Sequence, residues 1–441
     1  MSTASSTPKS HPSDQRPRDL FRDPEFIALA SVRFVSSMAF ATIIIALALY
    51  ADIFEASGIV AGLFGTAYAV VRLTMVLPLG RKIDIGNSKR YLLVGLGLNV
   101  VLLLGYIVVQ SVEHVIFLRG FQAIGSIVLW VTGLAVVGEI APDDGRGMWV
   151  GTYNQVSSIA SLSGDIVGGA LLFLAGFTVT YSVLIGLSMI STVLVFIYLR
   201  DDPGTRADPQ ASTGIETYRN LLARRVIVSL VVFRFAFSFG KMAVIIFLPI
   251  FARTEFGMSA LAIGGILAGG KLTKGLAQGY VGKMADRIGG LEWFIFAGTV
   301  GYALGTALIP AATVVHGTFE PISLSLAGET IALGPAFVLL FIAYSLLGMA
   351  DSLRLPTSMA LFVREGEHFD SVAGSLSLRS VSWQVGAIFG PLAVGAMFDH
   401  VSYLGGFWLA GGFIIVAGLV FIWLYESEAA PTTDVQPMPT D

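Results

Sequence analysis

The sequence predicts an all-α membrane protein whose twelve transmembrane helices form two pseudo-symmetric halves of six. Three observations support this fold class. Of the 441 residues, 55% are hydrophobic and 13% are charged, whereas about a quarter of the residues of soluble domains are charged. Apolar runs of about 18 residues or more, long enough to cross a bilayer as a helix, recur along the chain. One charged turn between two such runs occurs twice.

The repeated turn is GRKIDIGNSKR at 80–90 in the first copy and GKMADRIGG at 282–290 in the second. The copies share a glycine and an aspartate at the same interval, and the match continues upstream. The corresponding pairs are Gly80 with Gly282, Asp84 with Asp286, Arg72 with Lys274, and Arg33 with Arg234. A pattern kept over this length indicates a duplication, with the two halves as parallel repeats.

The apolar runs place the helices, and the polar stretches between them place the domain boundaries. We expect helices at about 26–50, 58–80, 91–110, 115–140, 149–175, 180–199, 228–251, 257–281, 293–312, 336–362, 372–397 and 403–425. Residues 1–25 are rich in serine, proline and charge, and 426–441 are acidic and proline-rich, so both are expected to be disordered cytoplasmic tails. The polar segment 200–225 is predicted to link a bundle at 26–199 to a second bundle at 226–425.

The basic residues predict the orientation. Most of the 27 lysines and arginines fall in the N-terminal tail and in the loops on its side of the membrane, whereas the opposite loops contain only Arg253. Loops rich in lysine and arginine stay in the cytoplasm. An even number of helices then places both termini in the cytoplasm, in a multi-pass protein of the cell membrane.

The composition also excludes several classes of protein. The chain has no cysteine and five scattered histidines, so it offers no disulfide and no metal site. A nucleotide-binding loop of the GxxxxGK[ST] kind and a catalytic constellation such as HExxH are both absent from the sequence. We therefore expect a protein that is not an enzyme, needs no cofactor and binds no nucleic acid. The expected partners are the lipid bilayer and a small-molecule substrate, with protons as a further candidate, and the expected state is a monomer.

Charged residues inside the predicted helices are the strongest functional signal. A charge at the bilayer centre costs at least about 2.5–3.5 kcal/mol, so such groups face protein or a wet cavity. The cations are Arg33, Arg72, Arg119, Arg234, Lys241, Lys271, Lys274, Arg354 and Arg379, and the clear acids are Asp165 and Asp351. The third, sixth, ninth and twelfth helices carry none and are expected to form an outer scaffold.

Six of these cations are candidates to bind the substrate: Arg33, Arg72, Arg234, Lys241, Lys271 and Lys274. Alternatives stay open for several basic residues. Arg33, Arg234 and Arg379 lie close enough to a helix end to reach the membrane surface. Arg354 lies one helical turn from Asp351, so a local ion pair is an equal alternative to a substrate contact.

The motif GKMADRIGG resembles the loop motif of the major facilitator superfamily, which stands between the second and third helices and recurs between the eighth and ninth. The second copy here is the closer match, because the first has Ile85 where the motif has arginine. In the family this loop clamps the two halves on the cytoplasmic face and helps them to switch. The resemblance implies a gating role for Gly80, Asp84, Gly282, Asp286 and Arg287.

Two further motifs are similar to motifs of this family. RGFQAIG, which begins at Arg119, resembles a pattern whose buried arginine is tied to proton coupling. GDIVGG, at 164–169, is similar to the antiporter motif Gly-Pro-x-x-Gly-Gly, with Asp165 in the place of proline. A Gly-Pro pair occurs instead at 390–391. This departure argues against the drug–proton antiporter subgroup.

The residues and the resemblance together predict a secondary active transporter that moves a small solute by alternating access. The excess of cations favours an anionic or amphipathic organic substrate. Proton coupling is assigned to Asp165 first and to Asp351 second, with Arg119 as a partner that either alternates with a proton or forms a fixed pair with Asp165. The alternatives are a multidrug-type proton antiporter and a transport-inactive membrane receptor of the same fold.

Overall fold

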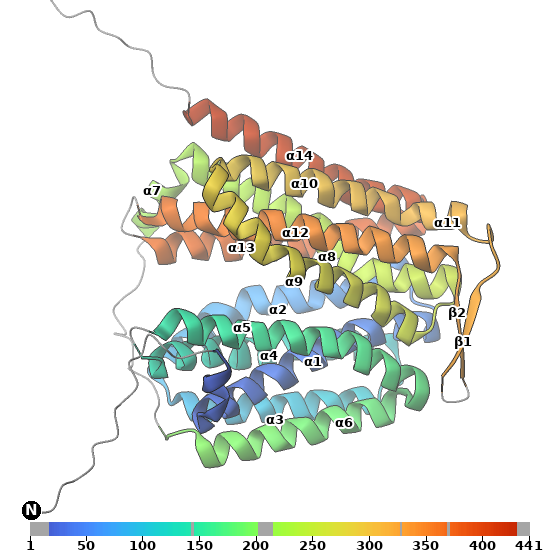
Figure 1. The fold of residues 1–441 in the computed structure, drawn as a ribbon, viewed down its shortest axis with the longest axis horizontal. Coiled ribbons are helices and arrows are strands. Elements are labelled where there is room, and N and C mark those ends of the chain that lie inside the picture. The colour runs from blue at the N-terminus through green and yellow to red at the C-terminus, as the bar shows by residue number, and fades with distance from the viewer. Residues whose placement is uncertain (1–16, 143–144, 202–214, 327–328, 368–370, 430–441) are drawn as a thin grey trace, which may run out of the picture.

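The computed structural model describes residues 17–142, 145–201, 215–326, 329–367 and 371–429, without the side chains of Asp84, Asp286, Ala373 and residues 215–217 and 426–429. It shows an all-α fold of long helices in two halves that lie side by side (Figure 1). The first half contains η2 (Pro17–Arg22), α1 (Pro24–Ile53), α2 (Gly58–Ile85), α3 (Ser88–Ile107), α4 (Val112–Ile140), α5 (Arg146–Ser163), the π-helical turn η4 (Gly164–Gly168) and α6 (Gly169–Tyr198).

The second half begins with a short helix and contains one β-hairpin. Its elements are α7 (Ile215–Leu222), α8 (Arg225–Phe256), α9 (Ala260–Ile288), α10 (Leu291–Leu308), η5 (Ile309–Ala311), α11 (Ala312–Val315), β1 (Ile322–Leu326), β2 (Glu329–Leu333), α12 (Pro335–Glu367), α13 (Val372–His400) and α14 (Tyr403–Ala429). The two ends of the bundle are named here by their landmarks. The hairpin end carries β1 and β2, and the α7 end lies opposite (Figure 1).

Among the described residues, ten helical segments are long and apolar enough to cross a membrane. One of them, Arg146–Tyr198, has 53 residues and contains two crossings. It turns back at Gly176, whose φ of 72° lies in the region that glycine adopts most readily. The long segment counts as two crossings, which gives eleven. Helix α9 is not among the ten segments, and with it the helices are compatible with the predicted twelve.

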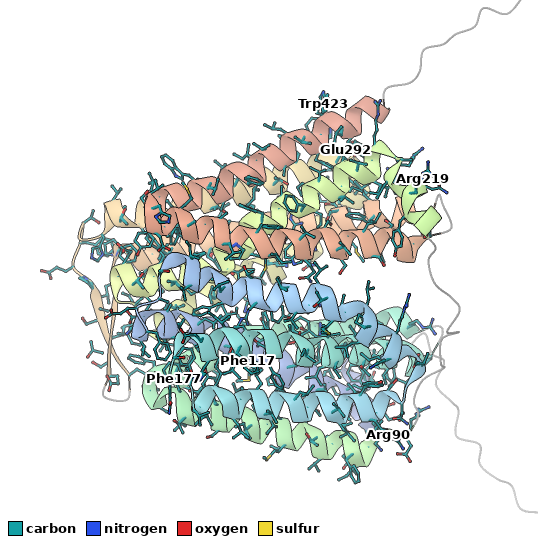
Figure 2. All side chains as sticks on the ribbon, turned by 180° about the vertical axis from the view of Figure 1, so that it is seen from behind. Arg90, Phe117, Phe177, Arg219, Glu292 and Trp423 are labelled. Carbon is teal, nitrogen blue, oxygen red and sulfur yellow. The ribbon has the colours of Figure 1, made fainter. Side chains whose placement is uncertain are left out.

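The charge-free helices lie at the outer margins of the bundle. In the first half α3 packs against α4 and α6, and in the second half α10 packs against α12 and α14. Figure 2 shows Trp423 of α14 on the outside of the bundle, and its side chain is 70% exposed. By contrast, α1 and α8 are buried along most of their length. The halves meet through α1 against α8, α2 against α13 and α6 against α9.

The sequence missed two ordered segments. Residues 17–25 were assigned to a disordered tail, but Leu20 is buried against the first half, and the Asp23 carboxylate accepts hydrogen bonds from the backbone N–H groups of Glu25 and Phe26, capping α1. The hairpin was not predicted either. Its strands pair antiparallel, with Ile322 opposite Leu333.

Candidate functional site

A cavity of about 770 Å³ lies between the halves on the side of the α7 end. Its walls are the later part of α5, from Gly151 to Leu162, and the part of α9 from Lys271 to Gly279. Most of the α5 wall carries small or amide side chains, so the cationic groups of this cavity come from α9. The α5 wall of the cavity is therefore mostly polar and neutral, and the α9 wall is basic.

A second cavity of about 180 Å³ adjoins the first, because Lys271 and Lys274 line both. We call it the lysine cavity. Its other lining residues are Lys241, Ile245, Gly270, Tyr302, Tyr344, Leu347, Gly348 and Asp351. Three of the six predicted substrate-binding cations therefore meet here.

One buried carboxylate organises the lysine cavity. Asp351 Oδ2 accepts from Lys241 Nζ and from Lys274 Nζ, each at 2.7 Å. Its Oδ1 accepts from Nη2 of Arg354, whose side chain is fully buried. The local pair between Arg354 and Asp351 is thus present, one turn apart on α12. Because three cations share one carboxylate, this cluster carries an excess of positive charge.

Asp165 lies where the two halves touch. Its side chain is fully buried in η4, and its Oδ2 lies 2.6 Å from Lys271 Nζ of the other half. Lys271 also donates to the backbone oxygen of Ser161 at 3.3 Å. A π-turn contains more residues than an α-turn and is frequent at functional sites. Here the turn places Asp165 against α1 and α9, where the antiporter motif would place a proline.

The structure does not form the predicted pair between Asp165 and Arg119. Arg119 Nε donates to the backbone oxygen of Phe64 at 2.8 Å, and its Nη1 donates to Gln122. Its guanidinium also lies 4.9 Å from the centroid of the Tyr68 ring. These partners of Arg119 are neutral groups inside the first half, whereas Asp165 pairs with Lys271 of the second half.

Arg33 and Arg72 share a tryptophan of the first half. Their guanidinium carbons lie 5.3 and 5.4 Å from the Trp130 ring centroid, within the range of a cation–π contact. Arg72 also donates to the Tyr68 hydroxyl at 3.0 Å. Neither arginine is among the lining residues of the two cavities described above.

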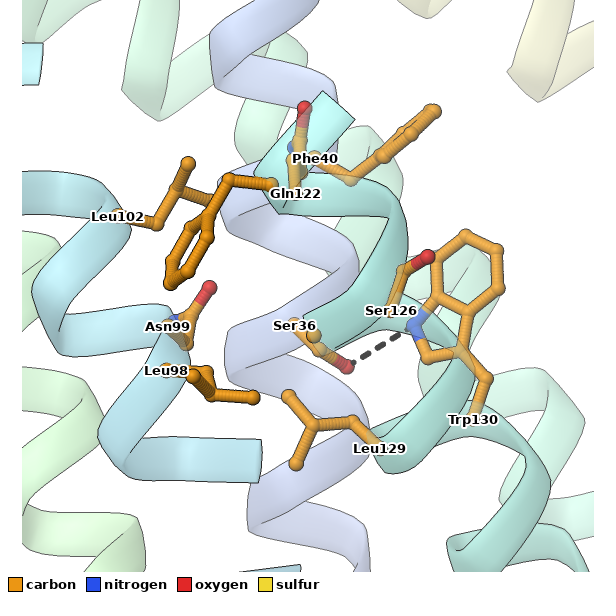
Figure 3. A pocket seen from close by; sticks show the side chains of 11 residues that line it. Ser36, Phe40, Leu98, Asn99, Leu102, Gln122, Ser126, Leu129 and Trp130 are labelled. Atoms are coloured by element: carbon orange, nitrogen blue, oxygen red, sulfur yellow. Dashed lines mark hydrogen bonds between the residues drawn. The ribbon is translucent and has the colours of Figure 1, made fainter. Parts of the chain in front are cut away.

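A small cavity with both apolar and polar lining residues lies beside this tryptophan (Figure 3). Trp130 Nε1 donates to Ser36 Oγ at 3.3 Å. The side chains of Asn99 and Gln122 also line the cavity, whose volume of about 20 Å³ is enough for about one water molecule. This cavity is too small for an organic substrate, so it belongs to the packing of the first half.

The remaining predicted residues lie in two places. Arg234 stands over the Trp383 ring, with 4.1 Å between its guanidinium carbon and the ring centroid. Gly80 and Gly282 lie near the α7 end, where a Cβ atom on either would meet nothing within 4 Å. Arg287 is exposed, and the side chains of Asp84 and Asp286 lie outside the described residues.

The repeated turn itself is shorter than the sequence suggested. Most of each motif is helical, because α2 continues to Ile85 and α9 continues to Ile288. In the second copy the turn is made by Gly289 and Gly290, whose φ angles are 70° and 64°. Sequence reasoning also missed Tyr302 and Tyr344 as lining residues, since an aromatic residue within an apolar run gives no signal of its own.

Comparisons with known proteins show the family of the chain. The family model of the Major Facilitator Superfamily matches residues 29–319 and 230–439. An uncharacterized transporter of this type from Methanocaldococcus jannaschii is 22% identical over 378 residues, which cover 85% of this chain and 91% of that protein. A second one, from Mycobacterium tuberculosis, is 30% identical over 129 residues, or 29% of this chain, and the match spans only 22% of that protein's length.

The fold also matches solved structures. A bacterial homolog of the human lysosomal transporter Spinster, solved in an inward-facing and unoccupied conformation, has a TM-score of 0.70 at 15% identity. The match covers 93% of this chain and 97% of that one. The two matches of the family model together cover both halves of the chain. The chain belongs to the major facilitator superfamily of membrane transporters.

Proposed function

We propose that this transporter moves a small organic anion by alternating access, coupled to protons, with the α7 end facing the cytoplasm of the cell. The observation that carries the proposal is the single carboxylate of Asp351 shared by Lys241, Lys274 and Arg354. The lysines are 18% and 30% exposed and line the lysine cavity. An anionic group that enters this cavity meets two ammonium groups already desolvated on one side.

The substrate and Asp351 compete for the same lysines. A carboxylate or phosphate bound to Lys241 and Lys274 replaces Asp351 as their partner. The displaced carboxylate then lies beside a second anion in a medium of low dielectric, so protonation of Asp351 is favoured. Substrate binding and proton binding at Asp351 therefore support each other, which is the thermodynamic condition for symport.

Asp165 supplies a second coupling site in this proposal. Its ion pair with Lys271 joins the two halves on the side of the cavity. A proton on Asp165 removes the attraction and frees Lys271 for the substrate. The gating residues of the repeated loop, and Arg119 with its internal partners, serve the switch between conformations and not the affinity. Arg33 and Arg72 belong to the opposite half and complete the site only when the halves rearrange.

The orientation follows the basic residues. Figure 2 places Arg90 of α3 and Arg219 of α7 at the same end of the bundle, as expected for a cytoplasmic face. Both termini are proposed to be cytoplasmic, and the protein is proposed to act as a monomer. Accessibility of single cysteines introduced at 430 and at 319, labelled in intact cells, tests the orientation, because the chain has no cysteine of its own.

The decisive experiment uses purified protein in liposomes with a panel of solutes and an imposed pH gradient. We expect anions to be taken up, and Lys274→Ala to weaken their binding at least about tenfold, since truncating one partner of a buried charged pair costs several kcal/mol. Lys283→Ala is the matched control, because Lys283 lies on the same helix and is exposed. Binding that is insensitive to Lys274→Ala and to added salt would contradict an anionic substrate.

A second candidate substrate class is favoured by the tyrosines of the cavity. Tyr302 and Tyr344 line it together with the lysines, and aromatic rings suit amphipathic compounds. Efflux of a neutral or cationic amphipathic compound in the same liposomes would select the multidrug-type antiporter. Binding without any movement of solute would select a transport-inactive receptor.

A further inference from the structure

Three arginines of the second half converge on one region outside the lysine cavity: Arg234 of α8, Arg354 of α12 and Arg379 of α13. The guanidinium carbon of Arg234 lies 4.1 Å from the Trp383 ring centroid, and that of Arg354 lies 3.6 Å from the Phe237 ring centroid. Phe237 follows Arg234 by one helical turn, and Trp383 follows Arg379 by one helical turn, so each pair lies on one face of its helix. The two aromatic rings thus join α8 to α13 through Arg234 and α12 to α8 through Arg354, and Arg379 lies near enough to both arginines for their charges to interact.

Arg234 and Arg354 are buried and Arg379 is partly buried, and the three have too few hydrogen-bond partners. Arg354 is 0% and Arg234 is 7% exposed. Among the described residues, five of their nitrogens are buried without a hydrogen-bond acceptor: Nε and Nη1 of Arg234, Nε and Nη1 of Arg354, and Nε of Arg379. In the part of the chain that the structure describes, the carboxylate that pairs with these arginines is Asp351, through Arg354 alone, and Asp351 already serves two lysines. The charges of Arg354 and Arg379 also repel that of Arg234.

Such an arrangement is unfavourable unless an anion balances it. A buried charge costs free energy when it has neither a counter-charge nor hydrogen bonds. A cation–π contact stabilises the guanidinium through its face and leaves its N–H groups free at the edge. Guanidinium edges bind oxyanions through paired hydrogen bonds. We propose that Arg234, Arg354 and Arg379 form a binding site for a small inorganic anion, of the phosphate or chloride kind.

This arginine site is distinct from the transport site. Arg234 and Arg379 are not among the residues that line the lysine cavity. Asp351 stands between the two, with Oδ2 on the lysines and Oδ1 on Arg354. The anion is therefore a resident ligand of the second half and not the transported solute. The inference goes beyond the proposed transport activity and does not depend on it.

The test is thermal melting of the purified protein in gluconate buffer, titrated with sodium phosphate or with sodium chloride at constant ionic strength. The wild-type protein should gain roughly 2–5 °C at saturating anion, because a ligand of the native state raises the melting temperature. Arg379→Gln should abolish this gain. It should also melt higher than the wild type in gluconate, because it removes a repulsive charge, whereas a merely structural arginine would melt lower when replaced.

Three further variants keep the test decisive. Arg234→Lys keeps the charge and loses the paired hydrogen bonds, so the anion concentration needed for half of the gain should rise about tenfold. Lys274→Ala should keep the full gain, and exposed Arg219→Gln is the surface control. A gain with either anion supports the site and identifies which anion it takes. No gain with either anion, a gain that survives Arg379→Gln, or a gain lost in Lys274→Ala would overturn the proposal.

Discussion

At the hairpin end the two halves meet backbone to backbone, while at the α7 end they stand apart. A Cβ atom on Gly395 of α13 would lie 2.2 Å from the backbone oxygen of Gly58 of α2, and one on Gly62 would lie 2.6 Å from the backbone oxygen of Pro391. The Asp399 carboxylate accepts from the backbone N–H of Gly58 and, at 2.9 Å, from that of Ile59. The second half therefore caps a helix of the first.

At the α7 end the facing glycines have space. A Cβ atom on Gly151 of α5, or on Gly275 or Gly279 of α9, would meet nothing within 4 Å. These residues line the larger cavity. The contrast between the ends indicates which contacts hold the present conformation. The hairpin end is held closed by backbone contacts and by one helix cap. At the α7 end, the glycines of α5 and α9 leave room for the halves to close.

The largest effect on this balance is expected from Gly395→Ala. Its methyl group collides with the backbone of the other half, and overpacking costs about 1–3 kcal/mol. The closed hairpin end should lose population by about fivefold to 150-fold. Distances between spin labels on introduced cysteines, one on each half at each end, report the change. Gly412→Ala is the control, because its Cβ meets nothing within 4 Å. Unchanged distances in Gly395→Ala would show that the contact does not hold the closed end.

The next effect is expected from Asp399→Ala, which removes the cap on α2. Loss of a helix cap costs about 0.5–2 kcal/mol, and here the cost falls only on the conformation in which the ends meet. The same labels should show a shift of about 1 kcal/mol. Ser57→Ala is the matched control, since Ser57 caps the same helix from within its own half. If Ser57→Ala shifts the distances as much as Asp399→Ala does, then the stability of α2, and not its cap from the other half, determines how far the hairpin end is closed.

A smaller effect is expected from the ion pair between Arg253 and Asp52, whose Nε and Oδ2 lie 2.7 Å apart across the halves. Both side chains are about one-third exposed, so the pair should contribute about 0.2–1 kcal/mol. A double-mutant cycle with Arg253→Gln and Asp52→Asn, read by the same labels, measures it. The coupling should shrink in 1 M salt, and a coupling that ignores salt would speak against a solvated pair.

The smallest effect on the resting balance is expected from Gly275→Ala, which should change it by less than about 0.5 kcal/mol. The new methyl group enters open space in the present conformation. It should slow transport, because α9 must approach α5 when the α7 end closes. Gly186→Ala, on an outer part of α6 with equally open space, should leave transport unchanged. Equal rates for the two variants would mean that the α7 end closes along other helices.

Much of the fold follows from the sequence because a membrane helix is a local property. Apolar length predicts each crossing, and the duplicated turn predicts the two halves. The strand β1 was missed, although its alternation ISLSL is typical of a strand. The tail was assigned wrongly from Pro17 because composition does not show that Leu20 finds a buried contact.

The sequence predicted which types of residue form the functional site, but not which cation pairs with which carboxylate. Charge within an apolar run singled out Asp351 and Lys274, because such a charge is costly. Which cation meets which carboxylate depends on the rotation of each helix, and the sequence assigned Arg119 to Asp165 where the structure has Lys271. Asp399 gave no signal, since a carboxylate at the end of a helix is ordinary.

The π-turn that carries Asp165 has a consequence for insertions and deletions. Each extra residue rotates the following part of a helix by about 100°, the angle per residue of an α-helix. The part of the chain before Gly164 lines the larger cavity, while Gly169, just after the turn, packs against Ala260 of α9. Deleting one residue within 164–168 would restore a regular helix and turn one of these faces away from its partner. This short stretch therefore sets the rotation of the helix segment that lines the cavity relative to the segment that contacts the other half.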